Sequence, residues 1–180
     1  MSDLPKVLIA YATVHGSTTE VAQFIGQVLA EYRFDVTVTP VENILSVAEY
    51  DAVILGSPIH TGMWLMPMTR FLNRFESELG RKPFYFFMTC IRVLEPDGYQ
   101  HAREHYVHHD TLAQIGVRDI GIFAGKLRWD SINLRDRWTL SLRYDGASGP
   151  SSRSDDFRDW TVIRAWAESV REGLEPRQHE

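Results

Sequence analysis

The stretch "KVLIAYATVHGSTTEVA", residues 6–22, decides the fold of this 180-residue chain. Its first part is a nearly continuous aliphatic run, which is typical of a strand buried on both faces of a sheet. Its second part places hydroxyl side chains and one glycine directly before a helical pattern, with no lysine or arginine. We therefore expect a strand, a polar loop and a helix in succession, and a loop that holds its ligand by hydrogen bonds rather than by positive charge.

Similar apolar runs recur along the chain and predict five strands. They are rich in β-branched or aromatic residues and lie at 6–12, 35–41, 50–57, 83–89 and 119–125. Four of the runs are nearly continuous, as buried parallel strands should be, whereas "DVTVTPV" (35–41) alternates as an edge strand does.

Helical patterns lie between these strands. Apolar residues repeat at helical spacing over 21–32, 68–79 and 157–174, and more weakly over 100–115. Strands that alternate with helices predict an α/β fold, a doubly wound five-stranded parallel sheet with helices on both faces. We expect one domain over 1–180, with an insert at about 128–155 before the last helix.

Composition excludes several classes of protein. The formal net charge of −5 gives no general reason to expect nucleic acid as a partner. The sequence shows no signal-peptide pattern and no apolar run long enough to span a membrane. Its single cysteine, Cys90, cannot form an internal disulfide and fits a reducing cytoplasm.

The loops that follow the first, third and fourth strands are the candidate binding loops. In doubly wound sheets, ligands bind outside the carboxyl ends of the strands, where the strand order reverses. The first loop sets four hydroxyls and Gly16 at the start of a helix, where free N–H groups attract a phosphate. An ordinary N-cap is the alternative interpretation. The loop contains neither a Walker lysine nor a GxGxxG dinucleotide fingerprint.

The first loop resembles the flavodoxin signature. The matching residues are Ile9, Tyr11, Thr13, Gly16, Thr18, Ala22 and Ile25, whereas Ala10 stands where a larger residue is usual. The resemblance implies FMN as cofactor, with its phosphate held by Thr13, Val14, His15, Gly16, Ser17 and Thr18. Hydroxyls and amides would leave the phosphate charge uncompensated, which helps to keep the flavin potential low.

The other two loops would then enclose the flavin ring. By this resemblance the second loop covers one ring face with Ser57, Pro58, Ile59, His60, Thr61, Gly62 and Trp64. Trp64 could instead be an ordinary core aromatic, and His60 a solvated loop histidine. The third loop would frame the pyrimidine edge with Thr89, Cys90 and Ile91, mainly through backbone groups. Cys90 fits a small buried apolar residue better than a redox thiol, since it has no CxxC partner.

The insert resembles a particular branch of the flavodoxin-like proteins. "FAGKLRW…LRDRW" and the final "DW" are similar to the menaquinone-dependent protoporphyrinogen IX dehydrogenases. Arginine beside aromatic side chains matches the propionates and the broad ring of a porphyrinogen, so we expect substrate contacts at Arg128, Trp129, Arg135, Arg137 and Trp138. Leu134, Trp138 and Leu142 also predict a basic amphipathic helix that could meet a membrane, receive a carboxylate, or pack on its own domain.

Three functions remain open from the sequence. The first is an FMN-dependent oxidoreductase that acts on a porphyrinogen or a quinone, the second is an electron carrier that docks onto redox proteins, and the third is a flavin-dependent regulatory module. We expect a cytoplasmic protein and leave open a homodimer and a contact with the inner face of the membrane. The histidines of "HAREHYVHHD" are His101, His105, His108 and His109. They have metal-ligand spacing but lack a supporting constellation, so we expect no metal.

Overall fold

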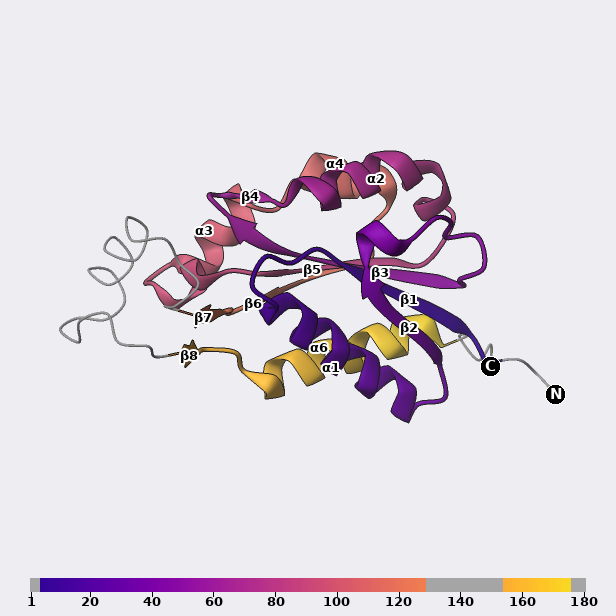
Figure 1. The fold of residues 1–180 in the computed structure, drawn as a ribbon, viewed down its shortest axis with the longest axis horizontal. Helices are drawn as coiled ribbons and strands as arrows, with labels where there is room; N and C mark the ends of the chain where they lie inside the picture. The colour runs from indigo at the N-terminus through magenta and orange to yellow at the C-terminus, as the bar shows by residue number, and fades with distance from the viewer. Residues whose placement is uncertain (1–3, 129–153, 176–180) are drawn as a thin grey trace.

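The computed structural model describes residues 4–128 and 154–175, and it has a parallel sheet at its centre (Figure 1). The strand order is β2-β1-β3-β5-β6, and all neighbours on this path run parallel. The strands are β1 (Lys6–Tyr11), β2 (Asp35–Pro40), β3 (Ala52–His60), β5 (Phe84–Thr89) and β6 (Asp119–Phe123). A sixth strand, β4 (Met63–Trp64), pairs antiparallel with the end of β3.

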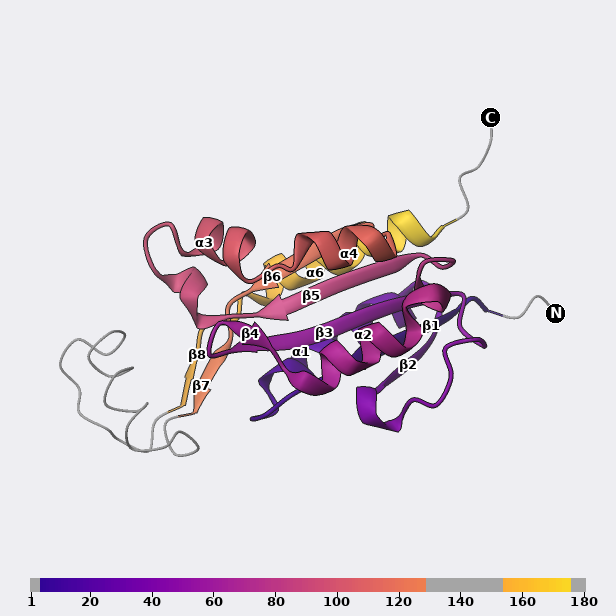
Figure 2. The same cartoon turned by 90° about the horizontal axis from the view of Figure 1, so that it is seen from above.

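Helices cover both faces of the sheet (Figures 1 and 2). One face carries α1 (Ser17–Glu31) and α6 (Trp160–Leu174), and the other carries α2 (Met66–Leu79), α3 (Gly98–His105) and α4 (His109–Ile115). Two short 3₁₀ turns, η1 (Val41–Asn43) and η2 (Ile91–Leu94), follow β2 and β5. The predicted doubly wound fold is confirmed. No helix among the described residues is long and apolar enough to cross a membrane.

Each strand sends alternate side chains into two separate cores. Leu8 packs with the α2 and α4 side, while Val7 and Ile9 pack with α1 and α6. The neighbouring strand β5 does the same with Phe86 on the first side and Phe87 on the second. Burial of a large apolar side chain stabilises the fold by roughly 1.5–3 kcal/mol. This two-sided burial is the reason why the central strands read as continuous apolar runs, and β2 alternates because it lies at the edge of the sheet.

The structure departs from the predicted elements in four places. Strand β4 was not predicted, and the weak helix over 100–115 is two helices, α3 and α4. Helix α6 begins at Trp160, so Phe157 lies before it, and the Asp159 carboxylate caps it by accepting from the N–H groups of Thr161 and Val162. An unpredicted antiparallel hairpin, β7 (Lys126–Arg128) with β8 (Ser154–Asp156), flanks the insert. The predicted amphipathic stripe at 134–142 lies outside the described residues.

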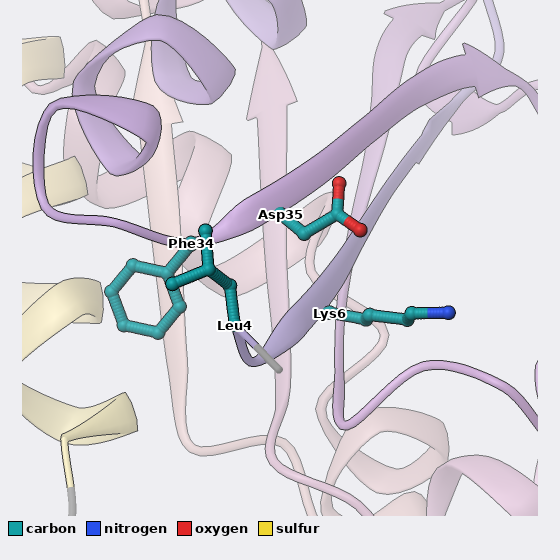
Figure 3. Close-up of a pocket in the computed structure, with 4 residues that line it drawn as sticks. All are labelled: Leu4, Lys6, Phe34 and Asp35. Atoms are coloured by element: carbon teal, nitrogen blue, oxygen red, sulfur yellow. The ribbon is translucent and has the colours of Figure 1, made fainter. Parts of the chain in front are cut away.

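A hollow lies at the amino end of the sheet, where β1 and β2 begin. Leu4, Lys6, Phe34 and Asp35 line it (Figure 3). Because parallel sheets bind their ligands at the opposite, carboxyl edge, we do not place the functional site in this hollow.

Candidate functional site

Hydrogen bonds join the three candidate loops at the carboxyl edge of the sheet. The N–H of Ala12 donates to the Gly56 carbonyl oxygen at 2.9 Å, which connects the first loop to β3. The Thr18 and Thr89 hydroxyls share a hydrogen bond with an Oγ1–Oγ1 distance of 3.1 Å, which connects the first loop to the third. The three loops predicted from the sequence therefore lie together, at the point where the strand order reverses between β1 and β3.

The first loop leaves the start of α1 open to an anion. Gly16 occupies the N-cap position with φ of 85°, in the left-handed region, and among the described residues no side chain caps the helix. A Cβ added at Gly16 would meet no heavy atom within 4 Å. The Thr13 hydroxyl oxygen accepts from the Gly16 N–H at 2.9 Å, which leaves the hydroxyl hydrogen of Thr13 able to donate. Open space, free helix N–H groups and a spare donor are the features that suit a phosphate.

The remaining residues of the first loop differ in exposure. Thr13, Val14 and His15 are exposed and Ser17 is half-buried, whereas Thr18 is fully buried. The buried Thr18 hydroxyl supports the loop from beneath through Thr89.

The second loop is a tight turn that folds the chain back onto β3. Thr61 and Gly62 both have positive φ, 50° and 81°, which is the conformation of a two-residue hairpin turn. The turn pairs Ile59 with Trp64 across β3 and β4. The buried Ser57 hydroxyl fixes the loop by donating to the Pro58 carbonyl oxygen (3.0 Å) and accepting from the Leu65 N–H (3.2 Å). Pro58 and Ile59 are half-buried, while His60 and Thr61 are exposed at the tip.

Trp64 lies in the core beneath this loop. Its side chain is 6% exposed, its ring stacks on His108 at a centroid distance of 4.3 Å, and it packs on Phe86 at 4.6 Å. Its indole N–H is buried and has no hydrogen-bond partner among the described residues. These contacts are those of a core aromatic, and contact between Trp64 and a flavin ring stays a prediction.

The third loop follows β5 and begins with two buried side chains. Thr89 and Cys90 are both almost fully buried, and the Cys90 N–H donates to the Phe123 carbonyl oxygen at 2.9 Å. Burial raises the pKa of the Cys90 thiol, so the neutral thiol is favoured over the reactive thiolate. Ile91 is half-buried and begins η2.

The histidine segment forms ring contacts rather than a metal cluster. His101 stacks on His105 at 4.2 Å, and the Nδ1 of His105 donates to the His101 carbonyl oxygen at 3.0 Å. The Nε2 of His109 donates to the carbonyl oxygen of Arg103 at 2.7 Å. Within residues 4–128 and 154–175, no three His, Cys, Asp or Glu side chains converge as metal ligands do.

Comparison with known proteins identifies the family. The family model described as "Flavodoxin domain" matches residues 8–154, which is most of the chain. The chain belongs to the flavodoxin family. Its cofactor is FMN, as the sequence predicted, and the open start of α1 fits the phosphate of that cofactor.

Two flavodoxin structures show how far the likeness of fold extends. A flavodoxin from the domain Archaea is 14% identical, has a TM-score of 0.58, and aligns over 94% of this chain and 98% of its own. Flavodoxin 2 from Bacillus cereus is 18% identical with a TM-score of 0.56, over 93% of this chain and 99% of its own. The whole described body, including both helical layers, therefore has the flavodoxin architecture.

Relatives with an assigned function are oxidoreductases. The protein "Protoporphyrinogen IX dehydrogenase [quinone]" of Leishmania major is 26% identical over 172 residues, which is 92% of this chain and 74% of the relative. The protein of the same name from Escherichia coli K12 is 22% identical over 170 residues, 92% of this chain and 94% of the relative. At this distance the similarity supports a flavin-dependent redox protein of the flavodoxin family.

Arg158 lies next to the candidate phosphate loop, and the sequence did not reveal this position. Its guanidinium lies beside the first turn of α1, where it pairs with Glu20 and Asp156. Of the predicted substrate residues, Arg128 ends β7, while Trp129, Arg135, Arg137 and Trp138 lie outside the described residues.

Proposed function

We propose that this flavodoxin-family protein is an FMN-dependent oxidoreductase that takes electrons and protons from protoporphyrinogen IX and passes them to a quinone. The observation that carries the proposal is the similarity over 92% of the chain to proteins named protoporphyrinogen IX dehydrogenase [quinone]. The bound flavin supplies the redox chemistry, and the chain's own residues bind, orient and shield it.

Each loop has a distinct part in this proposal. The α1 N–H groups and the Thr13 hydroxyl bind the phosphate, and the backbone of the second loop, with Ile59 and His60, covers one face of the ring. The third loop frames the ring edge through backbone groups at Thr89, Cys90 and Ile91. Trp64 supports the second loop from the core and is the aromatic residue nearest in sequence to its turn.

The surroundings of the three loops suit a broad apolar substrate. Large apolar side chains are exposed on or directly after the loops: Val14 is 51% exposed, Met63 60% and, at the end of η2, Leu94 40%. Exposed apolar side chains around a cofactor site favour contact with an apolar surface, such as a porphyrinogen ring or a quinone head group.

We propose that residues 128–144, with their arginines, receive the propionates of the porphyrinogen. A cytoplasmic protein that touches the inner face of the membrane would meet its quinone there.

An electron-transfer flavodoxin is the second candidate function. It is favoured by the alignment with the archaeal flavodoxin, which covers 98% of that chain. A carrier would exchange electrons with protein partners and would not turn over a small porphyrin precursor by itself. Its acidic surface would steer it to basic partners, but the formal net charge of this chain is only −5.

Steady-state turnover under anaerobic conditions separates the two functions. Purified holo-protein is mixed with protoporphyrinogen IX and a soluble menaquinone analogue, and porphyrin fluorescence is followed, with apo-protein as the control. Fluorescence that grows catalytically with holo-protein supports the oxidoreductase. Holo-protein that forms porphyrin no faster than apo-protein, but that a flavodoxin reductase reduces, supports the carrier.

A deletion tests the part proposed for the insert. Replacing 130–144 with a short glycine-serine bridge should leave FMN bound and abolish porphyrinogen turnover. Charge reversal at Arg135 and Arg137 should raise the KM for the porphyrinogen more than the KM for an uncharged quinone. If the deleted protein keeps full activity with both substrates, the insert is not the substrate site.

A further inference from the structure

We propose that Arg158 makes the cofactor site selective for a phosphate-bearing flavin, because it neutralises Glu20 just inside the helix end that receives the phosphate. Arg158 is a positioning residue in this proposal and does not touch the flavin itself. The inference rests on the first loop as the phosphate site, and it is independent of the substrate that the protein oxidises.

The guanidinium of Arg158 is enclosed and held from several sides. Its side chain is 2% exposed, its Nη2 donates to Glu20 Oε2 at 2.7 Å, and its Nε donates to Asp156 Oδ1 at 2.7 Å. A second bond from Nη2 to Asp156 Oδ2 makes this pair bidentate. Nη1 points to the Ser17 carbonyl oxygen at 3.4 Å, so the guanidinium spans the first turn of α1 from Ser17 to Glu20.

An aromatic contact fixes the guanidinium from the α6 side. Its central carbon lies 4.5 Å from the ring centroid of Trp160, and that ring packs on Phe24 of α1 at 4.9 Å. Burial alone would lower the pKa of Arg158, but its bonds to Asp156 and Glu20 outweigh the burial and raise the pKa. The same bonds from Arg158 lower the pKa of Asp156. The Arg158–Asp156 pair is therefore charged at neutral pH.

Glu20 needs this partner because of where the phosphate is bound. A carboxylate in the first turn of a helix is attracted by the helix dipole, but it repels a phosphate bound at the same end. Lys126 adds a longer contact to Glu20, with Nζ 3.9 Å from Oε1. Two cations, Arg158 and Lys126, thus balance two carboxylates, Glu20 and Asp156, so the formal charges of these four side chains sum to zero. Without Arg158 these side chains would sum to −1 beside a phosphate dianion, and because Glu20 is 48% exposed, solvent and salt would screen part of the repulsion.

An ion pair between α1 and α6 provides a control at the other end of α1. Arg164 of α6 forms a bidentate pair with Glu31 at 3.0 and 3.1 Å, and its guanidinium lies over Phe24 at 5.6 Å. Glu31 is the last residue of α1, so this pair joins α1 to α6 at the opposite end from the phosphate loop. Arg164 is 39% exposed and Arg158 2%, so R164M controls for the loss of an arginine–glutamate pair on α1 but not for burial. A residue that selects for the phosphate would act only at the end of α1 beside the phosphate loop.

The test compares FMN with riboflavin, which has the same ring but no phosphate. Apo-protein is titrated with each flavin, flavin fluorescence gives the two Kd values, and circular dichroism checks the fold of every variant. We expect R158M to raise the Kd for FMN several-fold, up to about tenfold, since the unpaired Glu20 carboxylate then repels the phosphate through partly screened charge. The Kd for riboflavin should change by less than about twofold, because no phosphate charge is involved. In the double variant E20Q/R158M the Kd for FMN should return most of the way to the wild-type value, because the repelling carboxylate is also removed. R164M should leave the ratio of the two Kd values as it is in the wild type.

A second variant keeps the test decisive if R158M does not fold. E20Q alone removes the repelling carboxylate and retains Arg158, so FMN should bind tighter relative to riboflavin than it does in the wild type. If R158M weakens the binding of FMN and riboflavin equally, or if E20Q leaves the ratio of the two Kd values unchanged, the proposal is wrong. Arg158 would then have only a structural role. Wild-type protein that does not prefer FMN over riboflavin would instead overturn the phosphate loop, and porphyrinogen turnover reports separately on the proposed reaction.

Discussion

Replacing the Thr18 hydroxyl should loosen the whole candidate site, because this buried group joins the first loop to the third. Thr18 and Thr89 are 0% and 3% exposed, and their hydroxyls share a hydrogen bond of 3.1 Å. Valine has nearly the same shape as threonine, so Thr18→Val removes the hydroxyl with little change in packing. A lost neutral hydrogen bond costs about 0.5–1.5 kcal/mol, and a buried polar partner left unsatisfied costs about 1–3 kcal/mol. We therefore expect the free energy of unfolding of T18V to fall by about 1–3 kcal/mol.

A double-mutant cycle isolates the hydrogen bond from the packing. T89V alone should cost about as much as T18V, whereas the double variant should cost little more than either single one, because no polar group is left unpaired. The assay is urea unfolding of the apo-protein followed by circular dichroism, so that FMN does not contribute to the measured stability. If the two single effects add to within about 0.5 kcal/mol, the hydroxyls do not interact and this link between the loops does not exist.

Four further outcomes follow from the site. Thr13→Ala should weaken FMN binding by about 1.5–3 kcal/mol, the value of a bond to a charged group, and an unchanged Kd would remove this hydroxyl from the phosphate site. Cys90 should resist iodoacetamide in the native protein at pH 8 and react on unfolding, since burial raises the pKa of its thiol; mass spectrometry decides, and rapid native labelling would contradict its burial. The Arg158 guanidinium lowers the pKa of Asp156, so this carboxylate stabilises the fold above its ordinary pKa of about 3.9 and loses that effect as the pH falls through the lowered value. As the pH is lowered below about 4, the urea midpoint of Asp156→Asn should therefore fall less than the urea midpoint of the wild type. If the two midpoints fall in parallel with pH, the Asp156 carboxylate does not contribute to stability in this way. FMN should quench the emission of Trp64, so Trp64→Phe, which keeps most of the packing, should show less quenching than the wild type; equal quenching would assign the effect to another tryptophan.

The strands could be predicted from the sequence because their environment is simple. Leu8, Val53 and Phe86 face one core while Ile9, Ile54 and Phe87 face the other, so the middle positions of the central strands are apolar on both faces. Such a pattern admits few alternatives. The edge position of β2 was also predictable, since only an edge strand has room for alternating polar residues.

The unpredicted elements are short or depend on contacts far apart in the chain. Strand β4 has two residues, and its only local signal is the Thr61–Gly62 pair, which takes positive φ at both positions. The break between α3 and α4 falls at Tyr106–His108, where the ring of His108 stacks on Trp64. That contact joins residues with no periodic relation in sequence, so helical spacing alone could not reveal the break.

The sequence allowed us to predict which loops form the candidate site, but not which charged side chains surround it. The carboxyl ends of β1, β3 and β5 must lie at one edge of a parallel sheet, so the three loops had to meet. Arg158 reaches Glu20 from 138 residues away, and no motif marks either residue. The first loop lacks lysine and arginine, yet the buried Arg158 from the far end of the chain lies beside the helix that this loop begins.

The most direct test of the proposed function is a single anaerobic mixing of protoporphyrinogen IX with a molar excess of oxidised holo-protein, so that several FMN groups can accept the electrons of one porphyrinogen, with no other acceptor present. The visible flavin absorbance and the porphyrin fluorescence are recorded together. We predict that the flavin bleaches as porphyrin fluorescence appears, and that adding a menaquinone analogue restores the flavin colour. A flavin that stays oxidised in the presence of protoporphyrinogen, but bleaches with a flavodoxin reductase, would contradict the oxidoreductase assignment.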